Sequence, residues 1–136
     1  MRFLLDTNII SDLVRNPSGP VAERISQIGE RNVCTSVIVA AELRYGVEKK
    51  RSPRLAAQVA AVLQALKIIP FEPPADQIYG RVRAQLERDG RIIGGNDLLI
   101  AAHALSLGMV LVTDNESEFS RVECLRWENW MRGARF

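Results

Sequence analysis

The residues that could carry chemistry are acids at the ends of apolar segments. Asp6 directly follows the apolar run 3–5, and Asp114 directly follows the run 109–113. Both runs predict short buried strands, and in an open parallel sheet ligands bind where the carboxyl ends of the strands meet. Glu42 and Asp97 belong to two apolar segments with the composition of helices. We expect these acids to open onto one crevice.

Such a cluster of acids favours a hard divalent cation. Acids that converge without a cationic partner repel and raise one another's pKa values. Oxygen ligands without His or Cys favour Mg²⁺, with Mn²⁺ as a possible substitute, over Zn²⁺. The single histidine, His103, excludes a closed His/Cys zinc site, and we expect it in the core or behind the site. The corresponding chemistry is phosphodiester hydrolysis by metal-activated water.

Glu42 is the acid with the most unusual sequence surroundings. It stands in the apolar run 37–43, which predicts a buried helix. A buried carboxylate costs on the order of several kcal/mol unless it is neutralised, paired or bound to a metal. A buried salt bridge to Arg44 or Arg81 is the structural alternative to a metal.

The other acids also have structural interpretations. Asp6 is a suitable N-cap for the helix that follows it. Asp97 gains from the dipole at the start of its own helix, where Asn96 is expected as the cap. Glu118 has the pattern of an ordinary solvated acid. The sequence leaves these alternatives open.

The composition is that of one α/β domain over residues 1–136. The chain is 47% hydrophobic and 25% charged, with a net charge of +2 that permits a nucleic-acid partner without requiring one. No signal or membrane segment is present in the sequence, so a cytoplasmic protein is expected. Cys34 and Cys124 form no CxxC pair, and buried reduced thiols are expected.

Short apolar strands alternate with amphipathic helices along the chain. This order predicts a central, mostly parallel sheet of four to five strands with helices on both faces. Turn residues and helix caps divide the chain into these elements. Strands are expected at 2–6, 32–35, 67–71, 109–113 and 124–127, and helices at 9–14, 21–28, 37–50, 53–66, 74–89 and 96–107.

Four motifs in this order and spacing resemble the PIN-domain family, and within it the VapC-like toxin ribonucleases of bacterial toxin–antitoxin modules. They are Leu4-Leu-Asp-Thr-Asn8, Ser36-Val-Ile-Val-Ala-Ala-Glu-Leu43, Asn96-Asp-Leu-Leu-Ile-Ala-Ala-His103 and Leu111-Val-Thr-Asp-Asn115. The resemblance covers essentially the whole chain. It implies a three-layer α/β/α fold and a metal-dependent endoribonuclease that cleaves RNA, often a tRNA or another structured RNA.

The resemblance also implies roles for individual residues. Asp6 and Asp97 would hold Mg²⁺, and Glu42 would be a ligand through water or the base that orients the attacking water. The family's fourth acid often falls on the position of Asn115, where this chain departs from the pattern. Glu118 takes that place in some branches, and Asp114 is adjacent. Residues expected to support the carboxylates or the scissile phosphate are Thr7, Asn8, Thr113 and Asp114. Attack by water predicts products with a 5′-phosphate and a 3′-hydroxyl.

Two basic stretches offer a track for RNA beside the acids, although both also fit solvated helix faces. The first comprises Arg44, Lys49, Lys50, Arg51 and Arg54, and the second Arg81, Arg83, Arg88 and Arg91. The resemblance further implies a VapB-like antitoxin that lies in a groove between the helices at 21–28 and 55–66. It also implies a homodimer, which we expect to use Val59, Val62 and Leu66, and toxin–antitoxin hetero-oligomers.

Three other functions compete with this interpretation. A structure-specific DNA nuclease would use the same carboxylates. A phosphatase with an aspartyl-phosphate intermediate would prefer an acid two residues after Asp6, where the chain has Asn8. A non-catalytic RNA-binding or adaptor domain would have lost metal ligands, and Asn115 is the one departure in that direction.

Overall fold

A five-stranded parallel sheet forms the centre of the fold in the computed structural model, which describes residues 2–131. The strands are ordered β3-β2-β1-β4-β5, and every neighbouring pair is parallel. Their bounds are β1 Phe3–Leu5, β2 Val33–Ser36, β3 Lys67–Ile69, β4 Val110–Val112 and β5 Trp127–Glu128. The predicted parallel sheet is therefore confirmed. The domain prediction of 1–136 includes residues outside the described range.

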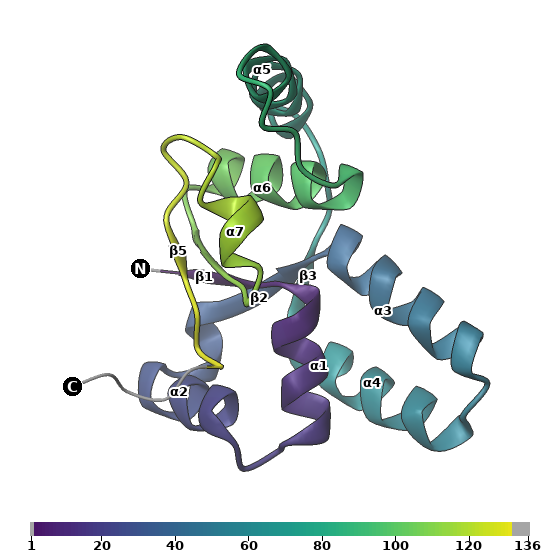
Figure 1. Cartoon of the computed structure of the whole chain (residues 1–136). Coiled ribbons are helices and arrows are strands. Elements are labelled where there is room, and N and C mark those ends of the chain that lie inside the picture. The colour runs from purple at the N-terminus through teal and green to yellow at the C-terminus, as the bar shows by residue number, and fades with distance from the viewer. Residues whose placement is uncertain (1, 132–136) are drawn as a thin grey trace.

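Helices cover both faces of this sheet and give the three predicted layers (Figure 1). On one side α6 packs over the strands, with α5 outside it, and α1, α2 and α4 lie on the other side. The α3–α4 hairpin projects from the side of the sheet. The helices are α1 Thr7–Arg15, α2 Pro20–Ile28, α3 Val37–Lys50, α4 Pro53–Ala65, α5 Ala75–Arg88, α6 Gly95–Leu107 and α7 Glu116–Phe119, with the short 3₁₀ helix η1 Glu30–Asn32.

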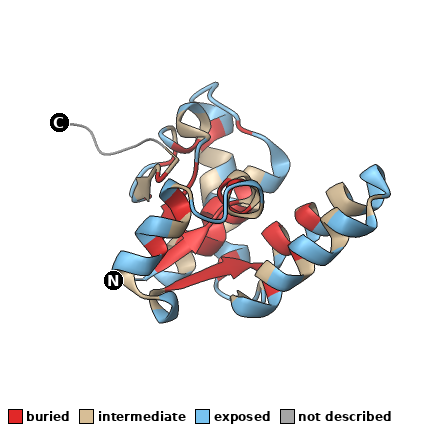
Figure 2. Ribbon diagram, turned by 90° about the horizontal axis from the view of Figure 1, so that it is seen from below, coloured by how far each residue is buried: buried red, intermediate tan, exposed pale blue. Residues whose placement is uncertain are grey.

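The core follows from strands that are covered on both faces. All residues of β1, β2 and β4 are buried, which explains why these segments are uniformly apolar or small rather than alternating. Figure 2 shows the buried strands in red and the exposed tip of the α3–α4 hairpin in pale blue. The largest fully buried side chains include Leu4, Ile10 and Phe119.

Two helix caps show how well local signals predicted the boundaries. The Oγ of Ser36 accepts the backbone N–H of Ile38, so Ser36 caps α3. The predicted cap of α6 is wrong, because the N-cap residue is Gly94 and Asn96 lies inside the first turn. The Asn96 side chain is therefore available for another contact.

The remaining expectations about the fold are met in part. His103 is buried, with its Nδ1 2.7 Å from the Ser36 Oγ, in the predicted core position. Cys34 is buried, but Cys124 is exposed, because it lies in a turn before β5 rather than in a strand. Across residues 2–131 there is no helix with the length and apolar character that crossing a membrane requires.

Candidate active site

The site lies at the carboxyl ends of β1 and β4, where the strand order of the sheet reverses. From β1 the chain continues to β2 on one side, and β4 is added on the other side, so the gap beyond β1 and β4 is a topological switch point. Asp6 stands there as the N-cap of α1, and its backbone N–H donates to the carbonyl of Val112 at 2.9 Å. Parallel pairing of β1 with β4 thus fixes Asp6 beside Thr113.

Asp6 is a buried carboxylate held by two donors. Its Oδ1 accepts the backbone N–H of Thr7 at 2.8 Å, and its Oδ2 accepts the hydroxyl of Thr113 at 2.7 Å. Burial raises the pKa of Asp6, the two hydrogen bonds oppose that rise, and the nearby charges of Glu42 and Glu118 add to it. Asp6 is a helix cap as well as a site acid, so the two interpretations are compatible.

Glu42 reaches the same site from α3, but its surroundings differ from the expected ones. The helix is not fully buried, and Glu42 itself is half-exposed. Its Oε1 accepts the hydroxyl of Thr7 at 2.6 Å, and its Oε2 accepts the amide of Asn96 at 3.1 Å. The alternative of a buried salt bridge to Arg44 or Arg81 is wrong, because the ion pairs within residues 2–131 involve other acids.

Asp97 and Glu118 form a pair joined by an asparagine. The Nδ2 of Asn115 donates to Asp97 Oδ2 and to Glu118 Oε2, both at 2.9 Å. Burial, a hydrogen bond with Glu118 and the charges of Asp6, Glu118 and Glu42 raise the pKa of Asp97 to about 8. The hydrogen bond from Asp97 in turn lowers the pKa of Glu118. The two carboxyl groups therefore titrate as a coupled pair, in which Asp97 is the one with the raised pKa.

These side chains line a pocket of about 390 Å³. Its walls come from β1 and α1, from α3, from the start of α6 and from the segment after β4. The lining residues are Asp6, Thr7, Asn8, Ser11, Arg15, Glu42, Asp97 and Asn115. Glu118 is not part of this lining, but it accepts the amide of Asn115, which is. Within the described part of the chain, no three His, Cys, Asp or Glu side chains are already arranged around a metal position.

Asp114 does not supply a carboxylate to this pocket. It is exposed, and its Oδ1 accepts the amide of Asn129 at 2.9 Å, while its backbone N–H donates to Asn8 Oδ1. The expectation that Asp114 could complete the site is therefore not met in this structure. Asn8 holds the segment after β4 against α1 rather than contacting an acid.

Comparison with known proteins identifies the family. The family model of the PIN domain matches residues 3–124 of the sequence. The chain is 39% identical over 132 residues to "Ribonuclease VapC2" of Haemophilus influenzae, covering 96% of this chain and 99% of that protein. The chain belongs to the PIN-domain family of VapC ribonuclease toxins.

Further relatives agree in sequence and in fold. The "tRNA(fMet)-specific endonuclease VapC" of Shigella flexneri is 37% identical over 131 residues, covering 96% of this chain and 98% of that protein. A crystal structure of VapBC2 from Rickettsia felis bound to a DNA fragment from their promoter has a chain that matches with a TM-score of 0.89 at 38% identity. The match covers 96% of this chain and 99% of that one. The predicted family, fold and ribonuclease activity are confirmed.

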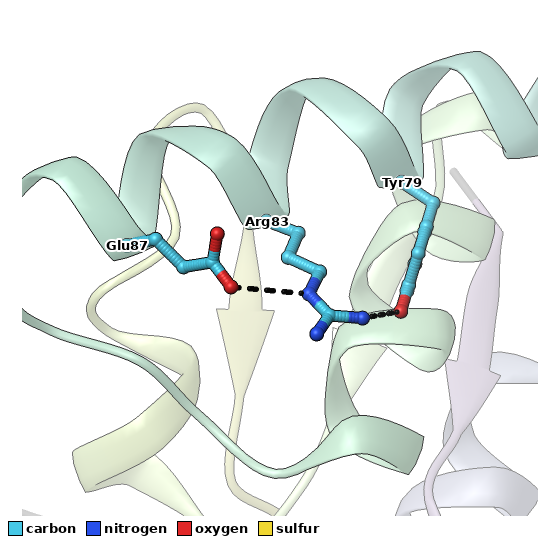
Figure 3. Close-up of polar contacts among 3 residues, drawn as sticks. All are labelled: Tyr79, Arg83 and Glu87. Atoms are coloured by element: carbon cyan, nitrogen blue, oxygen red, sulfur yellow. Dashed lines mark hydrogen bonds and ion pairs between the residues drawn. The ribbon is translucent and has the colours of Figure 1, made fainter.

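The basic residues of this PIN domain lie on exposed helix surfaces. Those predicted to contact RNA are exposed in both stretches: Arg44, Lys49, Lys50, Arg51 and Arg54 on α3 and at the start of α4, and Arg81, Arg83, Arg88 and Arg91 on and after α5. Arg83 is engaged within its own helix (Figure 3), where it donates to the Tyr79 hydroxyl at 2.9 Å and to Glu87 at 3.3 Å. The hydrogen bond with Tyr79, and after it the one with Glu87, raise the pKa of Arg83. Arg88 likewise donates to Gln85 Oε1 at 3.0 Å, so both arginines are engaged within α5.

Sequence reasoning missed two residues of the pocket. Ser11 and Arg15 follow Thr7 at intervals of four along α1, so the three side chains share one face of the helix. The spacing of four residues from Thr7 could have identified both residues, but they lie outside the four motifs. Arg15 is a cation in the lining of a pocket otherwise furnished with acids and neutral polar groups.

An apolar pocket of about 330 Å³ lies on the side of α1 and α2, as expected for a partner groove. Its lining includes Leu13 from α1, Ile25 from α2, and Val62 and Leu66 from α4 and its end. The prediction that Val59 contacts a second copy is wrong, since Val59 is buried in the core of its own chain. A dimer contact at Val62 and Leu66 would compete with any partner in this groove.

Proposed function

We propose that this chain is a Mg²⁺-dependent endoribonuclease whose working acids are Asp6, Glu42, Asp97 and Glu118. The observation that supports this is the gathering of the four carboxylates from four separate segments, with an Asp97 pKa of about 8. Burial and mutual repulsion of this kind destabilise the ionised carboxylates, so a bound cation would be favourable. A divalent cation would neutralise them, and carboxylate oxygens are the ligands that Mg²⁺ prefers.

Each acid then has a defined task. Asp6 and Asp97 would hold the cation, and Glu42, which is more exposed than Asp6, would orient the attacking water and accept its proton. Thr113 and Thr7 fix the carboxylates of Asp6 and Glu42 through short hydrogen bonds. When bound there, Mg²⁺ would make its bound water more acidic and would stabilise negative charge on the phosphate and the leaving oxygen.

Asn115 is suited to a site that exists with and without a cation. Its amide nitrogen now stands between Asp97 and Glu118 and reduces their repulsion. The same amide has an oxygen that can serve as a metal ligand once the carboxylates are neutralised. Asn115 would thus replace the usual fourth acid, with Glu118 behind it as the remaining carboxylate.

The substrate we propose is a tRNA, with the initiator tRNA as the first to test. The Shigella relative is named for that specificity, and the exposed basic residues of α3 and α5 would offer contacts to its phosphates. A VapB-like antitoxin would lie in the apolar groove of Ile25 and Val62 and place a basic side chain among the acids. A homodimer is also predicted, and sedimentation of the chain with and without antitoxin tests it.

The direct test uses the full chain, purified without a partner, on total cellular RNA and on an initiator tRNA transcript. Discrete cleavage with Mg²⁺ or Mn²⁺, lost in EDTA and in Asp97→Asn, with 5′-phosphate and 3′-hydroxyl ends, is the expected result. A 2′,3′-cyclic phosphate, or cutting that persists in EDTA, would contradict the mechanism. Cleavage of DNA instead would favour a DNA nuclease, and RNA binding without cleavage an adaptor.

A further inference from the structure

The exposed end of α1 carries a guanidinium that has no hydrogen-bond or ion-pair partner among residues 2–131. Arg15 is exposed in the last turn of α1 and lines the acidic pocket. The ion pairs among residues 2–131 join Arg24 to Glu128 and Arg83 to Glu87, so neither takes Arg15. The neighbouring acid Asp12 is buried and accepts the side chain of Asn16 instead.

The position of Arg15 gives the pocket two chemically different ends. The carboxylates stand near the start of α1, next to Thr7, and Arg15 follows eight residues later. At a rise of about 1.5 Å per residue, that separation is about 12 Å along the helix axis. Ser11 lies between them on the same face and adds no charge. One end would therefore attract cations and the other anions.

We infer that Arg15 binds a backbone phosphate of the RNA next to the one that is cut. This inference rests on the proposed function, in which the acidic end of the pocket would receive the scissile phosphate. A guanidinium presents a planar fork that bonds two phosphate oxygens together. Arg15 is a positioning residue, which fixes the strand so that the correct phosphate reaches the acids.

A neighbouring phosphate is held equally in the ground state and the transition state, and this defines the kinetic signature. Loss of such uniform binding raises KM and leaves kcat nearly unchanged. We expect Arg15→Gln to raise KM for an initiator tRNA transcript by about tenfold to a hundredfold, as for a lost charge-assisted hydrogen bond. The dependence of log(kcat/KM) on log[KCl] should become shallower by about one unit.

Two further variants separate this role from a structural one. Arg15→Lys keeps the charge but not the fork, so it should keep the salt dependence and recover part of the KM. Arg31→Gln removes an equally exposed arginine outside the pocket and should match the wild type. A merely structural Arg15, acting on the dipole of α1, would change the melting temperature and leave KM and the salt dependence unaltered.

The outcomes are distinguishable from failure of the proposed function. Wild-type KM and salt dependence in Arg15→Gln, or a fall in kcat alone, would overturn the inference while cleavage by the wild type stands. If neither the wild type nor Arg31→Gln cuts RNA, the proposed function fails. Fluorescence anisotropy with the same labelled tRNA transcript then still decides on Arg15, since weaker binding by Arg15→Gln alone supports it and equal binding of all variants contradicts it.

Discussion

Two asparagines of this PIN domain each bridge a pair of acids, and only one of the pairs belongs to the pocket. Asn115 Nδ2 donates to Asp97 and Glu118, and Asn129 Nδ2 donates in the same way to Asp114 and Glu116. The hydrogen-bonding pattern is therefore no sign of function by itself. An amide between two carboxylates is a general way to keep them together.

The difference between the pairs lies in their surroundings. Asp97 is half-buried, and burial, then its hydrogen bond with Glu118 and the charges of Asp6, Glu118 and Glu42, raise its pKa to about 8. Asp114 is exposed, where water and salt screen its charge. Desolvation and additional acids thus distinguish a candidate metal site from a surface contact of identical local design.

The largest contrast is expected between the same substitution in the two pairs. Asp97→Asn removes a direct ligand of the proposed cation and should lower kcat/KM for RNA about a thousandfold or more, because metal stabilisation of the transition state is worth several kcal/mol. Asp114→Asn should stay within about twofold of the wild type. Steady-state cleavage of one labelled RNA measures both. Equal losses in the two variants would mean that the pocket is wrongly placed.

The hydroxyl that holds Asp6 should have an intermediate effect. Thr113→Val keeps the shape of the side chain but removes the 2.7 Å hydrogen bond to Asp6 Oδ2. Supporting groups of metal ligands typically contribute about tenfold to a hundredfold to affinity or activity. We expect a loss of that size in Mg²⁺ affinity, read from the Mg²⁺ concentration that gives half-maximal cleavage. Unchanged Mg²⁺ dependence would remove Thr113 from the site.

Much of this site was predictable from the sequence because its acids directly follow strands or begin helices. Asp6 follows β1 and Asp97 begins α6, so topology alone brings them together. Glu42 does line the pocket, but the prediction of burial was wrong, since the apolar run 37–43 forms a half-exposed hairpin helix rather than a buried one. Apolar composition does not reveal which face of a projecting helix meets solvent.

The contacts between segments could not be predicted in the same way. The bridging roles of Asn115 and Asn129 depend on side-chain positions across separate loops. The sequence also suggested that Asn96 caps α6, whereas Gly94 is the N-cap and Asn96 donates to Glu42. Asn96 could either cap α6 or form a tertiary hydrogen bond, and a single sequence does not indicate which of the two it forms.

Matched substitutions at the two asparagines should change stability by a smaller amount. Asn115→Asp replaces a bridging donor by a third carboxylate between Asp97 and Glu118, so metal-free protein should lose on the order of 1–3 kcal/mol of unfolding free energy. Added Mg²⁺ should restore more stability to this variant than to the wild type. Asn129→Asp should lose less, and gain nothing from Mg²⁺. Urea denaturation with and without Mg²⁺ measures all three proteins, and an equal response to Mg²⁺ would place Asn115 outside the site.

Asp97 also gives a pH dependence to the stability of the metal-free protein. Its pKa is about 8 in the folded chain and near 3.8 when unperturbed, so the folded state binds more protons between these values. Stability must therefore fall as pH rises from about 4 towards 8. Glu118, whose pKa is lowered, acts the opposite way and only at lower pH, where its contribution is lost as pH falls. In EDTA, the urea midpoint at pH 8 should be lower than at pH 5 for the wild type and for Asp114→Asn. The difference between the two midpoints should be smaller for Asp97→Asn. A slope that Asp97→Asn leaves unchanged would show that the proton of the site resides on another acid.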